Sequence, residues 1–172
     1  GLPPLATREL LPAAGYHFAP PGGIADSDLA RATAVRVRLQ IFDSNGEAPF
    51  AGKRILLNGR DVAGVPASPA NRFHDWHEVI LELTPEQAGA IGRTNTIEIT
   101  NAGGDMWKLR GVALAVRHPA GHWVASRPDP RSFSAGGEGW LYHEGESWRD
   151  KTPPIRLELP GPGSDGIGQR ER

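Results

Sequence analysis

The stretch TAVRVRLQIF, residues 33–42, decides the fold of this 172-residue chain. Apolar side chains occupy every second position in it and alternate with Arg36, Arg38 and Gln40. Strict alternation over this length predicts a β-strand with one apolar and one polar face, because successive side chains of a strand point to opposite sides. We therefore expect a half-buried strand with its arginines on the outer face.

The same alternation recurs along the chain. In residues 108–117 the apolar side chains from position 112 onward share one face, and Gly111, Ala113 and Ala115 share the other. Small residues on a strand face let another layer of backbone approach closely. Further strands are predicted at residues 53–57, 78–83, 95–100, 122–125 and 155–159.

Turn residues separate these strands. Asn45-Gly46 and Asn58-Gly59 both predict tight turns, because Asn and Gly tolerate the positive φ angles that such turns need. A single helical turn is expected within residues 26–32.

A small helix is predicted to follow the strand at residues 78–83. Thr84 and Gln87 have the spacing of a capping box, and Pro85 suits the first helical position. Gly92 supplies a residue that ends a helix in the left-handed conformation. The helix is about two turns long on this interpretation, and it is the only well-punctuated helix in the sequence.

Many short strands with one small helix predict an all-β fold, a two-sheet antiparallel jelly-roll-like β-sandwich. The chain length suits one domain. We expect residues 1–32, rich in Pro and Gly, to form an extended N-terminal arm, residues 33–159 to form the sandwich, and residues 160–172 to form a polar C-terminal tail.

The composition narrows the classes of partner. The net charge of −1 gives no overall field that would attract nucleic acid or an anionic membrane. The absence of cysteine excludes disulfides, thiolate metal sites and cysteine nucleophiles. No apolar run approaches the roughly 18 residues needed to span a bilayer, and no signal peptide is recognisable.

The compartment is not decided by these features. The chain begins at Gly1 without Met, which removal of an export signal and simple trimming explain equally well. An extracytoplasmic location, periplasmic or secreted, in a bacterial setting is the expectation we carry forward.

Residues 54–124 resemble the galactose-binding-domain-like jelly rolls, which many carbohydrate-binding modules use. The segments that carry the resemblance are ILLNG at 55–59, the strand at 76–83 with its following turn, NTIEI at 95–99 and VALAV at 112–116. A weaker resemblance links residues 101–116 and Trp140-Leu141 to the PLAT, or lipoxygenase-homology, sandwiches that dock enzymes on membranes or proteins. Both resemblances imply a fold more than a function.

The segment RFHDWHE at residues 72–78 is the densest polar cluster. His74 and His77 are candidate ligands for a transition metal, together with neighbouring carboxylates, if the side chains converge. Residues three apart in an extended segment point to opposite faces, so the favoured alternative is a loop that Trp76 anchors to the core.

The loop at residues 101–107 offers a second candidate site. Asn101 and Asp105 supply oxygen atoms, and Trp107 supplies a flat ring on which a sugar can stack. Calcium can use the same oxygens, so it is the one cofactor that we keep open. The alternative is a glycine-rich connection with Trp107 buried.

Trp140, Tyr142 and Trp148 lie among glycines rather than in a periodic strand. They either cover an open end of the sandwich or anchor a partner. The sequence lacks the nucleophile-elbow, zinc-protease, phosphate-loop and dinucleotide motifs, and no catalytic residue is assigned.

We therefore expect a non-catalytic docking module, an accessory or structural subunit of a larger envelope, membrane-bound or viral assembly, whose partners are other protein subunits. The alternative is a carbohydrate-binding module that uses its loop aromatics on a glycan. A metal-dependent or glycoside-active enzyme domain is the distant third. The expected ligand-binding or partner-binding residues are Trp76, Asn101, Asp105, Trp107, Trp140, Tyr142 and Trp148.

Overall fold

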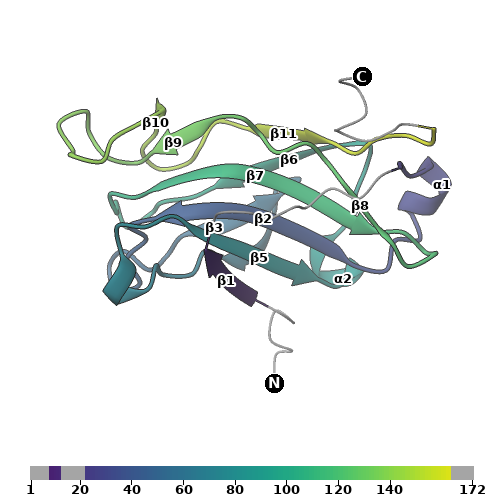
Figure 1. Ribbon diagram of the computed structural model, residues 1–172, viewed down its shortest axis with the longest axis horizontal. Coiled ribbons are helices and arrows are strands. Elements are labelled where there is room, and N and C mark those ends of the chain that lie inside the picture. The colour runs from purple at the N-terminus through teal and green to yellow at the C-terminus, as the bar shows by residue number, and fades with distance from the viewer. Residues whose placement is uncertain (1–7, 13–21, 164–172) are drawn as a thin grey trace.

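The alternating stretch at residues 33–42 forms β2 (Val35–Phe42), which lies in the interior of the larger of two β-sheets (Figure 1). The computed structural model describes residues 8–12 and 22–163. In this part of the chain two mostly antiparallel sheets face each other, and the helical elements are few and short. The predicted class, an all-β two-sheet sandwich, is confirmed.

The larger sheet has the strand order β1-β5-β2-β7-β9-β10. Short β8 pairs with one end of β7 and β9 pairs with the other end, so seven strands fill six positions. All its pairs are antiparallel except β9 with β10. Its strands besides β2 are β1 (Arg8–Pro12), β5 (His77–Leu83), β7 (Lys108–Arg117), β8 (Trp123–Ala125), β9 (Ser132–Ser134) and β10 (Glu146–Ser147).

The smaller sheet has the order β11-β6-β3-β4, with every pair antiparallel. Its strands are β3 (Arg54–Leu57), β4 (Arg60–Gly64), β6 (Thr94–Ile99) and β11 (Ile155–Glu158). Asn58 and Gly59 join β3 to β4 with φ angles of 52° and 83°, which confirms the tight turn predicted there.

The core fills the space between the two sheets. It is built from the apolar face of each alternating strand, and most of its side chains have no exposed surface. Each such side chain contributes about 1.5–3 kcal/mol of transfer free energy. The completely buried members include Val37, Leu39, Ile41, Ile55, Leu57, Val79, Leu81, Ile97, Ile99, Leu109, Leu114 and Phe133.

The helical elements are short. α1 (Asp26–Leu29) lies within the predicted turn at 26–32, and a single 3-10 turn, η1 (Ala70–Arg72), precedes β5. α2 (Pro85–Ala88) has the predicted capping box between Thr84 and Gln87 and the predicted proline. It ends at Gly89, whose φ is 77°, and not at Gly92, because a positive φ is a conformation that glycine adopts readily and that does not continue a helix.

Two sequence expectations about β2 and its loop are wrong. Asn45-Gly46 makes no tight hairpin, because β2 and β3 belong to different sheets and the connection must cross between them. The strand is not half-buried either: its arginines lie on the outer face as predicted, but Arg38 and Gln40 there are more than 90 % buried.

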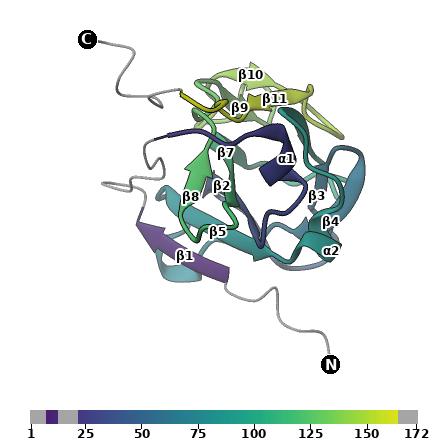
Figure 2. The same cartoon turned by 90° about the vertical axis from the view of Figure 1, so that its right-hand side faces the viewer.

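Four strands, β1, β4, β9 and β10, escaped the sequence analysis. β1 falls in the predicted N-terminal arm and pairs antiparallel with β5 at the sheet edge. Two parts of the predicted arm, residues 1–7 and 13–21, lie outside the described residues, and so does the predicted tail beyond residue 163. In Figure 2 the larger sheet runs from β1 at the lower left through β5, β2 and β7 to β9 and β10 at the top, and β3 and β4 of the smaller sheet lie to its right.

A substitution at Trp107 tests how this core is packed. Its ring has no exposed surface and packs edge-on against Trp148, with ring centroids 5.6 Å apart. We expect Trp107→Ala to lower the free energy of unfolding by about 3–5 kcal/mol in urea denaturation followed by circular dichroism. The matched control is Met106→Ala at the adjacent exposed position, for which we expect a change within about 0.5 kcal/mol. Equal effects of the two substitutions would contradict the core position of Trp107.

Candidate functional site

The register of three strands builds a row of polar side chains on the outer face of the larger sheet. Gln40 of β2 lies opposite Glu78 of β5 on one side and opposite Arg110 of β7 on the other. Since the facing residues of adjacent strands point to the same side of a sheet, all three side chains lie on the face that the apolar core does not use.

Hydrogen bonds run along this row. Gln40 Nε2 donates to Glu78 Oε1 at 3.2 Å, and Arg110 Nε donates to Gln40 Oε1 at 2.6 Å. Arg38 donates to the Glu78 carboxylate from Nε, and from Nη2 at 3.4 Å. Burial raises the pKa of the Glu78 carboxyl above its ordinary value, and the neighbouring Arg38 and Gln40 offset this only in part. Glu78 is thus a fully buried carboxylate whose contacts include an arginine and an amide.

A second row lies one step nearer the loops at the end of the sheet. Phe42 of β2 is opposite Lys108 of β7, and Trp76 immediately precedes β5. Lys108 Nζ lies 4.3 Å from the ring centre of Phe42 and 5.1 Å from that of Trp76. Arg110 Cζ lies 4.0 Å from the ring centre of Trp76. The two cations therefore pack on two aromatic rings, a contact worth about 0.5–2 kcal/mol each.

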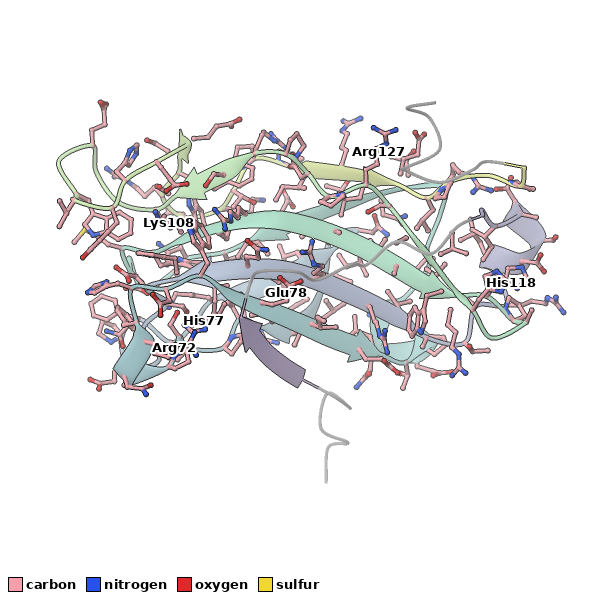
Figure 3. All side chains as sticks on the ribbon, in the orientation of Figure 1. Arg72, His77, Glu78, Lys108, His118 and Arg127 are labelled. Atoms are coloured by element: carbon pink, nitrogen blue, oxygen red, sulfur yellow. The ribbon has the colours of Figure 1, made fainter. Side chains whose placement is uncertain are left out.

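The loop after β9 covers this second row. Glu144 Oε1 accepts a hydrogen bond from Lys108 Nζ at 2.5 Å, and Glu144 Oε2 accepts one from Ser132 at 3.2 Å. The Lys108 hydrogen bond is the main reason that the pKa of Glu144 lies below its ordinary value. Figure 3 places Lys108 and Glu78 in one half of the sheet and His118 at the opposite end of the molecule.

Aromatic rings complete the site at the rim. Tyr142 lies 5.3 Å from Phe42, 4.7 Å from His74 in a stacked arrangement and 6.0 Å from Trp140, all measured between ring centroids. We call this set the outer-face cluster. Its members are Phe42, His74, Trp76, Lys108, Arg110, Trp140, Tyr142 and Glu144.

The structure thus divides the seven predicted site residues into two groups. Trp76, Trp140 and Tyr142 belong to the outer-face cluster and are partly exposed. The other four, Asn101, Asp105, Trp107 and Trp148, are buried.

Asn101 holds the second group together. Its Oδ1 accepts from Trp107 Nε1 at 3.2 Å, and its Nδ2 donates to the Asp105 carbonyl at 2.9 Å. Trp148 Nε1 is buried without a hydrogen-bond partner in the described part of the chain. With no exposed surface, Trp107 offers no ring face for a sugar, and these residues support the loops from inside.

Of the oxygens for which the sequence kept calcium open, Asp105 Oδ2 already has an ammonium partner, the side chain of Lys53. Lys53 Nζ donates to the carbonyls of Asn45 and Phe50 at 2.7 and 2.8 Å and lies 2.8 Å from Asp105 Oδ2. Burial lowers the pKa of Lys53, although Asp105 pulls in the opposite direction. The three oxygens already have a cationic partner, which links the loop after β2 to the loop before β7.

The two histidines considered as metal ligands have separate partners. His74 Nδ1 lies 2.7 Å from Asp43 Oδ1, and His77 Nε2 lies 2.8 Å from the Arg72 carbonyl. Burial raises the pKa of Asp43 in spite of its hydrogen bond to His74. Among residues 8–12 and 22–163, no group of three or more His, Asp or Glu side chains converges as a metal site would require.

The cationic half of the outer-face cluster was not predicted from the sequence. Lys108 and Arg110 were assigned to a strand, but no function was considered for them. A usable signal existed: residues 36–40 and 78–82 carry opposite charges on the polar faces of their strands. Such faces attract each other if the strands pair, but the sequence does not show which strands do.

Lys53 generates a stability prediction. We expect Lys53→Met to lower the free energy of unfolding by about 3–5 kcal/mol, because the Asp105 carboxylate would remain buried without its cationic partner. Lys151→Met is the matched control, since Lys151 is half exposed where it pairs with Glu98, and we expect a change of about 0–1 kcal/mol. Chemical denaturation of both variants checks this, and a loss no larger at Lys53 than at Lys151 would count against a buried pair.

Glu78 generates a pH prediction. Its pKa is raised in the folded protein, so between the unfolded and folded pKa values the folded protein binds more protons and stability falls as pH rises. The free energy of unfolding of wild type minus that of Glu78→Gln should therefore decrease as pH rises from about 4.5. Urea denaturation across pH measures the difference, in which the contribution of Asp43 cancels. A flat or rising difference would contradict the raised pKa.

The comparisons with known proteins leave the family open. No family model matches the chain, and neither a curated protein nor a solved structure does. In the described residues no helix is long and apolar enough to cross a membrane. The resemblance to galactose-binding-like and PLAT sandwiches therefore stays an expectation, and the outer-face cluster is the feature on which a function can be argued.

Proposed function

We propose that the chain is a non-catalytic docking module that binds a protein subunit of a larger assembly through the outer-face cluster. The observation that carries the proposal is the exposure of two large apolar side chains beside that cluster. Leu141 is 83 % exposed and Met106 is 53 % exposed, and they are the exposed large hydrophobic residues of the described part of the chain.

Both side chains belong to the loops that flank the cluster. Leu141 lies between Trp140 and Tyr142 in the sequence, and Met106 lies two residues before Lys108. A surface that combines exposed aliphatic side chains with Trp, Tyr and Arg has the composition of protein interface centres, where aromatic residues, Met and Arg are enriched. Burying Leu141 against a partner would contribute about 1.5–3 kcal/mol before the costs of association.

The cluster is already ordered by its internal contacts. Tyr142 packs on both Phe42 and His74, and Glu144 fixes its loop to Lys108 and Ser132. A surface whose side chains are held in place before binding loses less conformational entropy when a partner arrives. This favours a recognition role.

The same contacts speak against acid–base chemistry here. Glu78 is bonded to Arg38, and Glu144 is bonded to Lys108. Each carboxylate thus has a cation in direct contact, whereas a general acid and a general base need one proton-accepting and one proton-donating group facing the substrate.

A carbohydrate-binding module is the second candidate, and one observation favours it. Trp76, Trp140 and Tyr142 are partly exposed and lie next to hydrogen-bonding side chains, a combination that suits sugar recognition. Arg110 covers a face of Trp76, however, and His74 covers a face of Tyr142. These covered faces, together with exposed Leu141, make a protein partner the better match.

Site-specific photocrosslinking in the cells that make the protein tests the proposal. With benzoylphenylalanine in place of Leu141, we expect a single adduct of defined mass, because the side chain would lie inside the interface. The control position is Glu158, which is exposed on β11 of the other sheet, and it should give no such adduct. The adduct should be lost when Met106→Asp is added, since a charge would then enter the same contact.

Two results would count against docking: no adduct from position 141, or equal adducts from positions 141 and 158. A glycan array probed with the isolated protein separates the second candidate. Binding to one glycan that Trp76→Ala abolishes, together with absent crosslinks, would replace the docking proposal by the carbohydrate one.

A further inference from the structure

We propose that Arg110 is an anion-recognising residue of this surface and that the protein partner presents the carboxylate of an Asp or Glu side chain to it. This inference rests on the docking proposal and adds the chemistry of the partner. Its starting point is an arginine that is fixed in position and yet has unused hydrogen-bond donors.

The guanidinium of Arg110 is held from two directions. Its Nε donates to Gln40 Oε1 at 2.6 Å, and its plane lies over Trp76 with Cζ 4.0 Å from the ring centre. Within residues 8–12 and 22–163, neither of its terminal nitrogens, Nη1 and Nη2, has a hydrogen-bond or ion-pair partner. The side chain is only partly exposed, so these donors lie at the edge of the buried row.

The charges around Arg110 are already matched to other groups. The carboxylates whose fields reach it are those of Glu144 and Glu78. Glu144 is in direct contact with Lys108, and Glu78 is in direct contact with Arg38. Arg110 itself makes no ion pair in the described part of the chain. Burial lowers its pKa more than the Glu144 and Glu78 carboxylates raise it, so its charge is incompletely compensated.

A carboxylate is the group that fits these donors. The terminal nitrogens of a guanidinium form a planar fork that matches the two oxygens of a carboxylate, and the resulting hydrogen bonds are charge-assisted. Gln40 and Trp76 fix the plane of the fork before binding. Because Glu78 and Glu144 lie near, a singly charged anion is favoured over a doubly charged phosphate, which they would repel more strongly.

The neighbouring side chains indicate the kind of molecule that carries the carboxylate. Leu141 and Met106 are exposed apolar groups, and the contacts from Arg110 through Trp76, Phe42 and Tyr142 lead to the loop that contains Leu141. An acidic residue beside aliphatic or aromatic residues on a protein would satisfy both parts of the surface. An acidic polysaccharide would satisfy only the cation.

Arg36 is a matched control within the same sheet. Like Arg110 it lies on the polar face, and its Cζ is 4.0 Å from the ring centre of a tryptophan, Trp123. Unlike Arg110 it already has a carboxylate, since its Nε donates to Glu82 at 2.8 Å. Substituting Arg36 therefore removes a similar cationic side chain whose charge is already paired with Glu82.

Selection from a phage-displayed library of random peptides tests the inference. Wild-type protein should enrich peptides that carry Asp or Glu next to apolar residues. Arg110→Gln should lose the acidic preference, and Arg36→Gln should keep it. For a selected peptide, calorimetry should show an affinity about 10- to 100-fold weaker with Arg110→Gln. Replacing the acidic residue of the peptide by its amide should give the same loss, and the two changes together should cost little more than either one.

Several outcomes would overturn the inference. Enriched peptides without acidic residues would overturn it while leaving docking intact, provided that the crosslink at position 141 forms. Equal losses from Arg110→Gln and Arg36→Gln, with both proteins melting like wild type, would show a general charge effect in place of a specific contact. If no peptide is enriched and polygalacturonate binds through Arg110, the protein partner is wrong. Without peptide enrichment or crosslinks, the docking proposal fails as well.

Discussion

The position of β2 between β5 and β7 is the constraint on which the rest of the structure depends. A strand with neighbours on both sides fixes two registers at once, and here they bring Glu78, Gln40 and Arg110 into one line. On the opposite face the same registers bring Val37, Leu81 and Leu114 together in the core. One set of backbone hydrogen bonds therefore orders both the packing and the polar row, and neither can shift without the other.

The polar row also shows what burial demands. Arg38, Gln40 and Glu78 are each at least 90 % buried, and buried charged groups are tolerated only when they are paired and hydrogen-bonded. Glu78 meets this condition through Arg38 and Gln40. Arg110 stands at the margin of the row, where its Nε donates to Gln40 and its terminal nitrogens have no partner among the described residues. The same three adjacent strands thus carry both the buried polar row and the partly exposed residue at its margin.

The sequence was informative wherever a local pattern was enough. Alternation located most of the strands, Asn58-Gly59 located a turn, and Thr84 with Gln87 located the start of α2. It did not fix the pairing, because the opposite charges on residues 36–40 and 78–82 are compatible with pairing of those two strands but do not determine the order of strands along a sheet. For this reason Asn45-Gly46 was read as a hairpin turn although the chain changes sheets there, and the cluster that depends on pairing was found only in part.

Trp107 shows how a single backbone feature changes the assignment of a site. Strict alternation in residues 108–117 would place Trp107 in phase with Gly111, Ala113 and Ala115, on the outer face. The register of β7 against β2 shifts by one residue between Arg110 and Ala113, which marks a β-bulge.

Gly111 lies at this shift with a φ of 64°, while a Cβ placed there would meet only ordinary contacts. The positive φ therefore favours glycine at this position, whereas the available space would also admit a larger side chain. The bulge reverses the phase of the strand, so Trp107 and Leu109 face the core while Lys108 and Arg110 face outward. A glycine inside a strand is a recognised sign of a bulge. Here the bulge places Trp107, a predicted binding residue, in the core. It also places Lys108 and Arg110, for which no function was predicted, in the outer-face cluster.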